Sequence, residues 1–374
     1  MYFNNDQKQP DALSEILALR PSSADILPKK PDRLYSRIKG ALVGRLAGCM
    51  LGVPVEQYTI LRMQAIAMET GTSFPPVTYW RGTDREEYMH YGINSIKEYL
   101  EDNICCAAGD DDVTYVMLNL LLLEKYGKNY TVDDVGKLWV EILPYACTAE
   151  YDALVQLKAG TKAEFAANFG NYVEWIGAAI RADAFGYAQA GDPVGAAKLC
   201  YNDAYLSHRK NGIYGEMFCA AAIAAAFTAE SPLDAVREGM KQIPVESELY
   251  QALEWAFSVE DKVTNYARAR MLIDEKFENM NWVHTINNMV AIVFSLMLGG
   301  NDFDKCISEC IAMGLDNDCT GATVGSIIGA FLGIEGIPLH WYDRFNDKIM
   351  TYIVGHGEFS IEDTVKRFME LNDK

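Results

Sequence analysis

Two groups of acidic residues are the clearest candidates for chemistry in this sequence. Gly109 is followed by three consecutive aspartates, Asp110, Asp111 and Asp112, and a second group, Asp316 and Asp318, lies much later in the chain. Adjacent carboxylates repel one another, so something must compensate their charge. Helix capping is one explanation, since acidic residues stabilise a helix N-terminus by a few tenths to ~1 kcal/mol each. Capping needs one or two such residues, however, and not three.

A hard divalent cation is the other explanation. Mg²⁺ and Ca²⁺ prefer carboxylate oxygens, and two distant clusters could supply the halves of one two-metal site, with ions roughly 3.5–4 Å apart. An EF-hand loop starting at Asp316 is excluded, because its twelfth position is Ile327 where a glutamate is required. An isoprenoid-synthase Asp-Asp-x-x-Asp motif is excluded too, because Thr114 and Tyr115 stand at the fifth positions.

Helices must position these carboxylates, because the surrounding sequence has helical periodicity. Apolar residues recur at helical spacing over 113–123, which predicts a helix that starts at Val113 and stops at Gly127. Thr131 and Asp134 predict a capping box for a second helix, which should end before Pro144.

Two further helix starts are predicted at Ser231-Pro232 and at Ser360 with Asp363. Alternating strand patterns are rare, so the predicted fold class is all-α. The stretch 71–109 has the least periodicity, and we expect it to be rich in loops.

Glycines repeat every four residues before the first cluster and after the second. Glycine lowers helix stability, so glycines on one face predict close packing against another helix. Such packing would also fix the carboxylates at the helix N-terminus. The two glycine series are Gly40, Gly44, Gly48 and Gly52, and Gly321, Gly325 and Gly329.

Net charge restricts the classes of partner. The 374 residues include 33 Lys and Arg against 52 Asp and Glu, for a formal charge of −19. Such a surface repels polyanions, so we expect neither nucleic-acid binding nor association with anionic membranes. A phosphorylated substrate would need a local positive charge, which a bound metal ion could supply.

The cysteines indicate the compartment. Nine scattered cysteines without a Cys-x-x-Cys pair indicate a reducing environment, and the N-terminus lacks the order of a signal peptide. The apolar runs near 218–228 and 289–298 are too short to cross a bilayer. We therefore expect a cytoplasmic protein, with residues 1–34 as an N-terminal appendage and 35–374 as a single domain.

Several segments resemble the ADP-ribosylglycohydrolases, a family that includes the dinitrogenase-reductase-activating glycohydrolases. Arg37–Glu56 resembles the opening of the family, and Asp110–Val113 stands where the family has Thr-Asp-Asp-Thr. Leu315–Cys319 stands where it has Gly-Asp-Thr-Asp-Thr, and Gly333–Pro338 with Trp341 resembles its usual ending. The resemblance therefore extends from about Arg37 to Trp341.

The resemblance implies an all-α orthogonal helical bundle and a Mg²⁺-dependent hydrolase. Two Mg²⁺ ions would lie at the base of a cleft, with Mn²⁺ or Ca²⁺ as possible replacements. ADP-ribose, or a related ribosyl group, would be cleaved at the anomeric ribose carbon from an ADP-ribosylated protein or a small ADP-ribose derivative. Glu56 is the candidate acid/base. The metal ligands implied by position are Asp110, Asp111, Asp112, Asp316 and Asp318.

The family's central Asn-Gly segment corresponds to residues 207–217 and implies substrate contacts for His208, Asn211, Gly212 and Tyr214. An Asn-Gly pair favours a tight turn whose exposed N–H groups could hold a phosphate. The segment 174–186 also resembles one bacterial branch, but the sequence attaches no chemistry to it.

This sequence departs from the family pattern at the proposed metal ligands. Val113 and Cys319 replace threonines, Asp110 replaces another, and Cys49 stands where many members carry aspartate. These departures leave two alternatives open: a hydrolase of another nucleotide-like or glycosidic substrate, and a non-catalytic ADP-ribose binder. The dense cluster of acidic residues argues against a protein that binds ADP-ribose without cleaving it.

Overall fold

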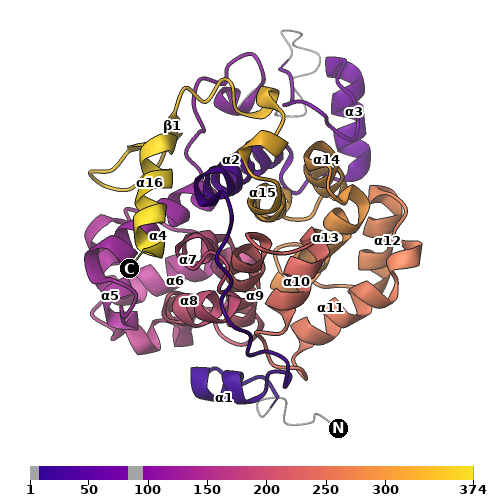
Figure 1. Ribbon diagram of the computed structural model, residues 1–374. Helices are drawn as coiled ribbons and strands as arrows, with labels where there is room; N and C mark the ends of the chain where they lie inside the picture. The colour runs from indigo at the N-terminus through magenta and orange to yellow at the C-terminus, as the bar shows by residue number, and fades with distance from the viewer. Residues whose placement is uncertain (1–7, 83–95, 374) are drawn as a thin grey trace.

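Helices form nearly all of the regular structure in the computed structural model, which describes residues 8–82 and 96–373 (Figure 1). The predicted all-α class is confirmed. The α-helices are α1 (Leu13–Ala18), α2 (Leu34–Gly52), α3 (Ile60–Thr70), α4 (Asp111–Tyr126), α5 (Val132–Ile142), α6 (Thr148–Lys158), α7 (Asp183–Ala188), α8 (Pro193–Ser207), α9 (Asn211–Ala226), α10 (Pro232–Met240), α11 (Glu248–Ser258), α12 (Tyr266–Lys276), α13 (Thr285–Gly299), α14 (Phe303–Met313), α15 (Asn317–Leu332) and α16 (Ile361–Asn372).

Short 3₁₀ turns connect several helices, and one small antiparallel hairpin precedes α16. The hairpin pairs Ile349 with Phe359. The strands are β1 (Lys348–Met350) and β2 (Glu358–Ser360), and the 3₁₀ turns are η2 (Val53–Val55), η5 (Lys97–Tyr99), η6 (Ala163–Phe169), η7 (Ile176–Arg181), η8 (Glu260–Lys262), η9 (Ile334–Gly336) and η10 (Leu339–Trp341).

Helices α2 and α15 pack directly against each other through their glycines (Figure 1). A Cβ atom on Gly44 would overlap the carbonyl oxygen of Gly325, and one on Gly48 would overlap that of Gly321. The predicted close approach of the two glycine-lined helices is therefore confirmed. Gly52, at the end of α2, touches the backbone of Asp318, so the contact extends to the second acidic cluster.

Helix α9 lies near the centre of the molecule, in contact with α7, α8 and α10 (Figure 1). All of its residues are buried. A helix that is apolar all round belongs in a core, because no face of it gains from contact with water.

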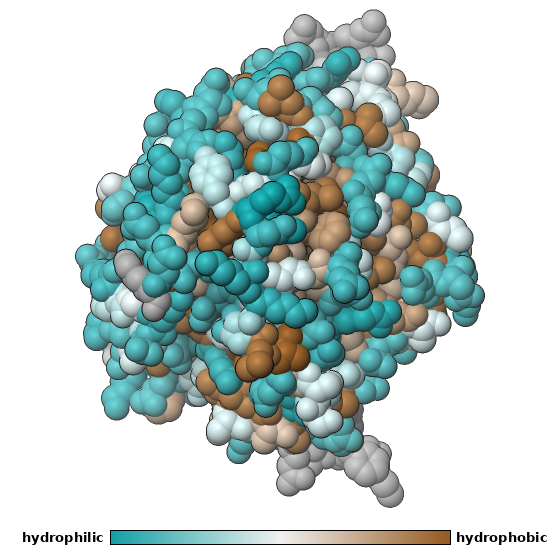
Figure 2. Space-filling model, in the orientation of Figure 1, coloured by the Kyte–Doolittle hydropathy of each residue, from teal (hydrophilic) through white to brown (hydrophobic). Residues whose placement is uncertain are grey.

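Hydrophilic side chains predominate on the face drawn in Figure 2, in keeping with the large net charge.

The helix boundaries confirm most of the sequence predictions. Thr131 and Asp134 form the predicted capping box, and the helix they open ends at Ile142. Ser231 and Ser360 cap their helices through side-chain hydrogen bonds. Between 71 and 109, the described residues form no α-helix; residues 83–95 lie outside the described part of the chain.

The predicted start of α4 at Val113 is wrong. The helix begins at Asp111, and Asp110 is its N-cap, with its side chain accepting a hydrogen bond from the amide of Asp112. Two of the three aspartates are therefore inside the first helical turn. The amides of this first turn have no partner within the helix, and the positive end of the helix dipole favours acidic side chains there.

The described part of the N-terminal segment packs on the body of the molecule. The hydroxyl of Tyr214 donates to the carbonyl of Pro10 at 2.6 Å, and the amide of Lys210 donates to Asp11 Oδ1 at 2.8 Å. The side chain of Gln9 is buried. Residues 8–11 thus cover the start of α9. The division into an appendage and a single domain stays a prediction.

One stretch, Leu34–Val55, is long and apolar enough to cross a membrane by length and composition, and our sequence analysis did not single it out. In the fold it is a core helix, since 89% of its apolar window is buried inside the protein. Its apolar character is explained by contact with α15 and neighbouring helices.

Candidate functional site

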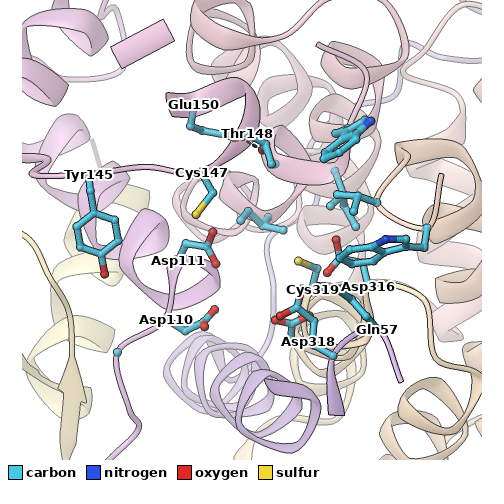
Figure 3. Close-up of a pocket in the computed structure, with 18 of the residues that line it drawn as sticks. Gln57, Asp110, Asp111, Tyr145, Cys147, Thr148, Glu150, Asp316, Asp318 and Cys319 are labelled. Carbon is cyan, nitrogen blue, oxygen red and sulfur yellow. Dashed lines mark hydrogen bonds between the residues drawn. The ribbon is translucent and has the colours of Figure 1, made fainter. Parts of the chain in front are cut away.

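A cavity of about 480 Å³ opens where the N-termini of α4 and α15 meet the chain that follows α2 (Figure 3). Figure 3 shows Asp110 and Asp111 on one side of this cavity and Asp316 and Asp318 on the other. The two acidic clusters, distant in sequence, therefore come together. The lining residues are Glu56, Gln57, Gly109, Asp110, Asp111, Tyr145, Cys147, Thr148, Glu150, Trp175, Ile176, Gly177, Ile180, Trp282, Val283, Asp316, Asp318, Cys319 and Tyr352.

Each cluster is held by the first turn of a buried helix. Asp316 occupies the N-cap position of α15, and Asp318 is in its first turn. The amide of Asp316 donates to Asn288 Oδ1 of α13 at 3.3 Å, which fixes the entry to the helix. Because Gly52 has no side chain, α2 can approach this turn closely.

Within residues 8–82 and 96–373, three groups of side chains bring potential metal-ligand atoms within 4.8 Å of one another. One consists of oxygen donors only, and each of the other two contains one thiol. The groups are Glu56, Asp316 and Asp318; Asp112, Asp318 and Cys319; and Cys49, Asp110 and Asp112.

Among the described residues, Arg45 is the one cation that forms an ion pair with these acids. Its Nη2 lies 2.8 Å from Asp112 Oδ1, while its Nη1 lies 2.8 Å from Asp183 Oδ2. One guanidinium is thus divided between two carboxylates. Asp112 Oδ2 and Asp318 Oδ1 are buried and have no hydrogen-bond partner. Unpartnered buried carboxylate oxygens are costly, so this set of residues fits a bound cation.

Burial and mutual repulsion raise the pKa values of the clustered acids. Burial raises the pKa of Asp112 to about 8 despite the favourable charge of Arg45, and burial raises that of Asp316 to about 7. The pKa of Asp110 lies well above its ordinary value because of burial and because Asp111 is adjacent. The same holds for Asp318, where Glu56 adds repulsion to the burial. A bound divalent cation would offset both effects, because its charge stabilises the ionised carboxylates.

Glu56, the candidate acid/base, lies at the cavity in the turn after η2. Gln57 donates to Glu56 Oε1 at 3.3 Å, and the amide of Gln57 donates to the carbonyl of Leu315 at 3.3 Å. The turn is therefore tied to the second cluster. Burial raises the pKa of Glu56, with a contribution from the charge of Asp111.

Aromatic rings form walls of the cavity that our sequence analysis did not assign. Trp175 and Trp282 come from two segments joined by backbone hydrogen bonds, from Ile176 to Val283 at 3.0 Å and from Thr285 to Glu174 at 3.1 Å. Elsewhere on the lining, Tyr145 and Tyr352 stack with their ring centroids 4.2 Å apart. For the first wall, the only sequence signal was the segment 174–186, to which no chemistry was attached.

The predicted substrate contacts His208, Asn211, Gly212 and Tyr214 do not line this cavity, and all four are buried. The expected tight turn at Asn211-Gly212 is wrong, because both residues lie in the first turn of α9. Asn211 Nδ2 donates to Glu174 Oε2 at 2.7 Å, next to Trp175. Its side chain therefore supports the segment that carries Trp175.

His208 and Tyr214 have structural partners as well. Ser207 Oγ lies 2.8 Å from His208 Nδ1, and burial lowers the pKa of the imidazole well below its ordinary value. Tyr214 bonds the N-terminal segment through Pro10. These residues are buried away from the cavity because α9 is apolar on nearly all of its faces, so its first turn packs in the core.

A second buried acidic group reaches the same cavity through Glu150. Arg181 Nη1 lies 2.7 Å from Glu150 Oε1, and its Nε lies 2.6 Å from Asp203 Oδ2. Its Nη2 lies 3.7 Å from Glu216 Oε2. Burial raises the pKa of Glu150 to about 7. The sequence analysis did not single out any of these residues.

Comparison with known proteins agrees with this geometry. A family model described as ADP-ribosylglycohydrolase matches residues 30–371. A solved structure described as an ADP-ribosylglycohydrolase-related protein complex is 17% identical in sequence, with a TM-score of 0.60. The similarity covers 91% of this chain and 98% of that one, and at such identity it shows the fold alone. No curated protein matches the chain.

Proposed function

The chain belongs to the ADP-ribosylglycohydrolase family, whose members are hydrolases of ribosyl glycosidic bonds, and from this premise we propose its reaction. The protein removes ADP-ribose, or a related ribosyl group, from a modified side chain or small molecule by cleavage at the anomeric ribose carbon. One observation carries the proposal: two carboxylate clusters and Glu56 meet in a cavity that has aromatic walls.

The proposed cofactor is a pair of divalent cations, with Mg²⁺ as the first candidate and Mn²⁺ or Ca²⁺ as replacements. When bound, the ions would stabilise negative charge on the substrate and orient its ribose hydroxyls. Among the described residues that line the cavity there is no lysine or arginine, so a diphosphate needs such a counter-charge. The proposed ligands are Asp110, Asp111, Asp112, Asp316 and Asp318.

Glu56 is proposed to move the proton in this reaction. Burial raises its pKa above the ordinary value, which is the direction that a general acid needs. That proton would pass to the leaving atom as the bond to the anomeric carbon breaks. A water molecule would then add to that carbon, and Glu56, now a carboxylate, would take up the proton that the water loses. Trp175 and Trp282 offer flat apolar surfaces that exclude water and can stack against a planar base.

The first experiment measures ADP-ribose release from arginine-, serine- and glutamate-linked substrates and from O-acetyl-ADP-ribose. Each is assayed with Mg²⁺, with EDTA, and with the Asp316→Ala variant. We expect release from at least one substrate that needs both the metal and Asp316. Failure on every substrate, despite tight metal binding, would favour a different nucleotide-like or glycosidic substrate.

A Glu56→Gln variant separates a hydrolase from a non-catalytic binder. Loss of a general acid lowers the rate by about 10²–10⁴-fold, while the affinity for ADP-ribose should change little. Glu124→Gln is the matched control, because Glu124 pairs with Arg367 away from the cavity. Unchanged release by Glu56→Gln would remove Glu56 from the mechanism.

We also propose a cytoplasmic location. All nine cysteines are unpaired in the structure. Free thiols in such number are typical of proteins kept in a reducing compartment.

A further inference from the structure

Cys319 stands inside the acidic site, in the first turn of α15 (Figure 3). The residue is 7% exposed and lines the cavity. The Sγ atom and carboxylate oxygens of Asp112 and Asp318 all lie within 4.8 Å of one another. We call Asp112, Asp318 and Cys319 the thiol triad.

The thiol triad contains two carboxylate oxygens that bond nothing in the protein. Asp112 Oδ1 accepts a hydrogen bond from Arg45 Nη2 at 2.8 Å, while Asp112 Oδ2 has no partner. Asp318 Oδ1 has no partner either. The two residues are 0% and 5% exposed, respectively. Buried oxygens of this kind are normally satisfied, so their joint position beside a thiol indicates a ligand that completes them.

The donor chemistry of this triad differs from that of the group at the cavity face. Glu56, Asp316 and Asp318 offer only hard oxygen donors, which suit Mg²⁺, Ca²⁺ or Mn²⁺. The thiol triad replaces one oxygen by sulfur, and a thiolate is a weak ligand for Mg²⁺ but a good one for Zn²⁺.

We propose that the thiol triad is an inner site for a borderline divalent cation of the Zn²⁺ type, bound through the Cys319 thiolate. The centre then holds two unlike ions, a hard one among the remaining proposed oxygen ligands, Asp110, Asp111 and Asp316, and a thiophilic one at the inner site. This inference rests on the proposed function, because it changes the identity of one of the two proposed ions.

Cys49 is the second thiol found in the groups of possible metal ligands among the described residues, and the geometry does not favour it. It belongs to the group with Asp110 and Asp112, is completely buried, and does not line the cavity. Only the thiol triad combines two unpartnered carboxylate oxygens with a sulfur that faces the cavity. Cys49 therefore serves as a matched control.

The experiment uses Co²⁺ as the probe, because thiolate-bound Co²⁺ gives a charge-transfer absorption that oxygen ligands do not give. The reference protein carries Cys105→Ser, Cys106→Ser and Cys147→Ser, since these three thiols are the more exposed ones and could bind the probe elsewhere. We expect one equivalent of Co²⁺ to produce the charge-transfer band. Zn²⁺ should displace this ion, and excess Mg²⁺ should not.

The decisive variant is Cys319→Ser in this reference protein. We expect it to lose the band and to bind Zn²⁺ at least about tenfold more weakly, a loss that even an outer-shell change can cause. The Cys49→Ser variant should keep the band. Co²⁺ bound without a charge-transfer band, or a band that survives Cys319→Ser, would overturn the inference.

A measurement on the reference protein covers the case in which Cys319→Ser does not fold. Zn²⁺, in the presence of excess Mg²⁺, should protect Cys319 from alkylation, as followed by peptide mass spectrometry. Unchanged alkylation would also overturn the inference. Since these readouts do not depend on turnover, they can fail while Mg²⁺-dependent ADP-ribose release persists, and the reverse is equally distinguishable.

Discussion

Two groups of buried carboxylates contribute to one cavity, and they differ in how their charge is compensated. In the first, Arg181 contacts Glu150, Asp203 and Glu216 at distances from 2.6 to 3.7 Å. Burial and the charge of Asp203 raise the pKa of Glu216 well above its ordinary value. This group therefore carries its own cation.

The second group has many more charges than resident cations. Among the described residues, Arg45 is the one cation that forms an ion pair with this group: it contacts Asp112 and is also paired with Asp183. Asp112 and Asp318 each keep an unpartnered oxygen. The members are Glu56, Asp110, Asp111, Asp112, Asp316 and Asp318.

The comparison separates an acidic group with a cation at its centre from one whose acids mostly lack such a partner. In the first group, the Arg181 guanidinium contacts all three carboxylates, although Asp203 Oδ1 and both oxygens of Glu216 have no hydrogen-bond partner. The second group is held in place by the N-terminal turns of α4 and α15 although its charges repel. Such an unfavourable arrangement persists where the surrounding structure fixes it. A diffusible cation can relieve that repulsion, so binding energy becomes available at the cavity.

The largest expected effect is on the group that carries its own cation. Arg181→Leu leaves buried carboxylates without their partner, and we expect a loss of about 3–5 kcal/mol in the free energy of unfolding, measured by urea denaturation. Arg367→Leu is the control, because its partly exposed pair with Glu124 should contribute about 1 kcal/mol or less. A similar small loss for both variants would contradict the distinction between the two groups.

A pH effect of intermediate size sharpens the comparison. The pKa of Glu150 is raised from 4.5 to about 7, so the folded protein binds a proton that the unfolded chain releases. Stability therefore falls as pH rises from about 4.5 to about 7, by at most about 3 kcal/mol from this residue. Urea denaturation at pH 5 and pH 8 should show a smaller difference for Glu150→Gln than for the wild type. An equal difference would remove Glu150 as the cause.

The smallest expected effect is a gain in stability rather than a loss, and it concerns the second group. Asp318→Asn removes one repelling charge, so we expect the metal-free protein at pH 8 to gain about 1–2 kcal/mol in stability. The same variant should lose the stabilisation that divalent cations give to the wild type. Thermal unfolding with EDTA and with Mg²⁺ measures both changes. A destabilised metal-free variant would mean that Asp318 is already compensated within the protein.

Local rules predicted most helix boundaries. The caps at Thr131, Ser231 and Ser360 follow from hydrogen bonds between residues three apart, which need no tertiary information. The glycine series also predicted a close helix pair, because the four-residue repeat puts all of the glycines on one face. The start of α4 was wrong by two residues, since capping and helical positions of aspartate look alike in sequence.

The cavity walls could not be predicted in the same way. Trp175 and Trp282 meet only because the segments around them pair through backbone hydrogen bonds. Tyr145 and Tyr352 stack across an even larger sequence separation. Asn211 has the residue type expected of a binding loop, but the burial of α9 turned its side chain into a support for Glu174.

The sequence by itself determined the all-α class, the two acidic clusters and the glycine faces, because each depends on residue type and short spacing. Only the tertiary structure decided which acids meet. Crossing of α2 and α15 places Asp318 against the end of α2, and Arg45 compensates Asp112 but not Asp318. Charge compensation depends on distance in space rather than along the chain. For that reason the composition showed the excess of acid, and only the fold showed where it stays uncompensated.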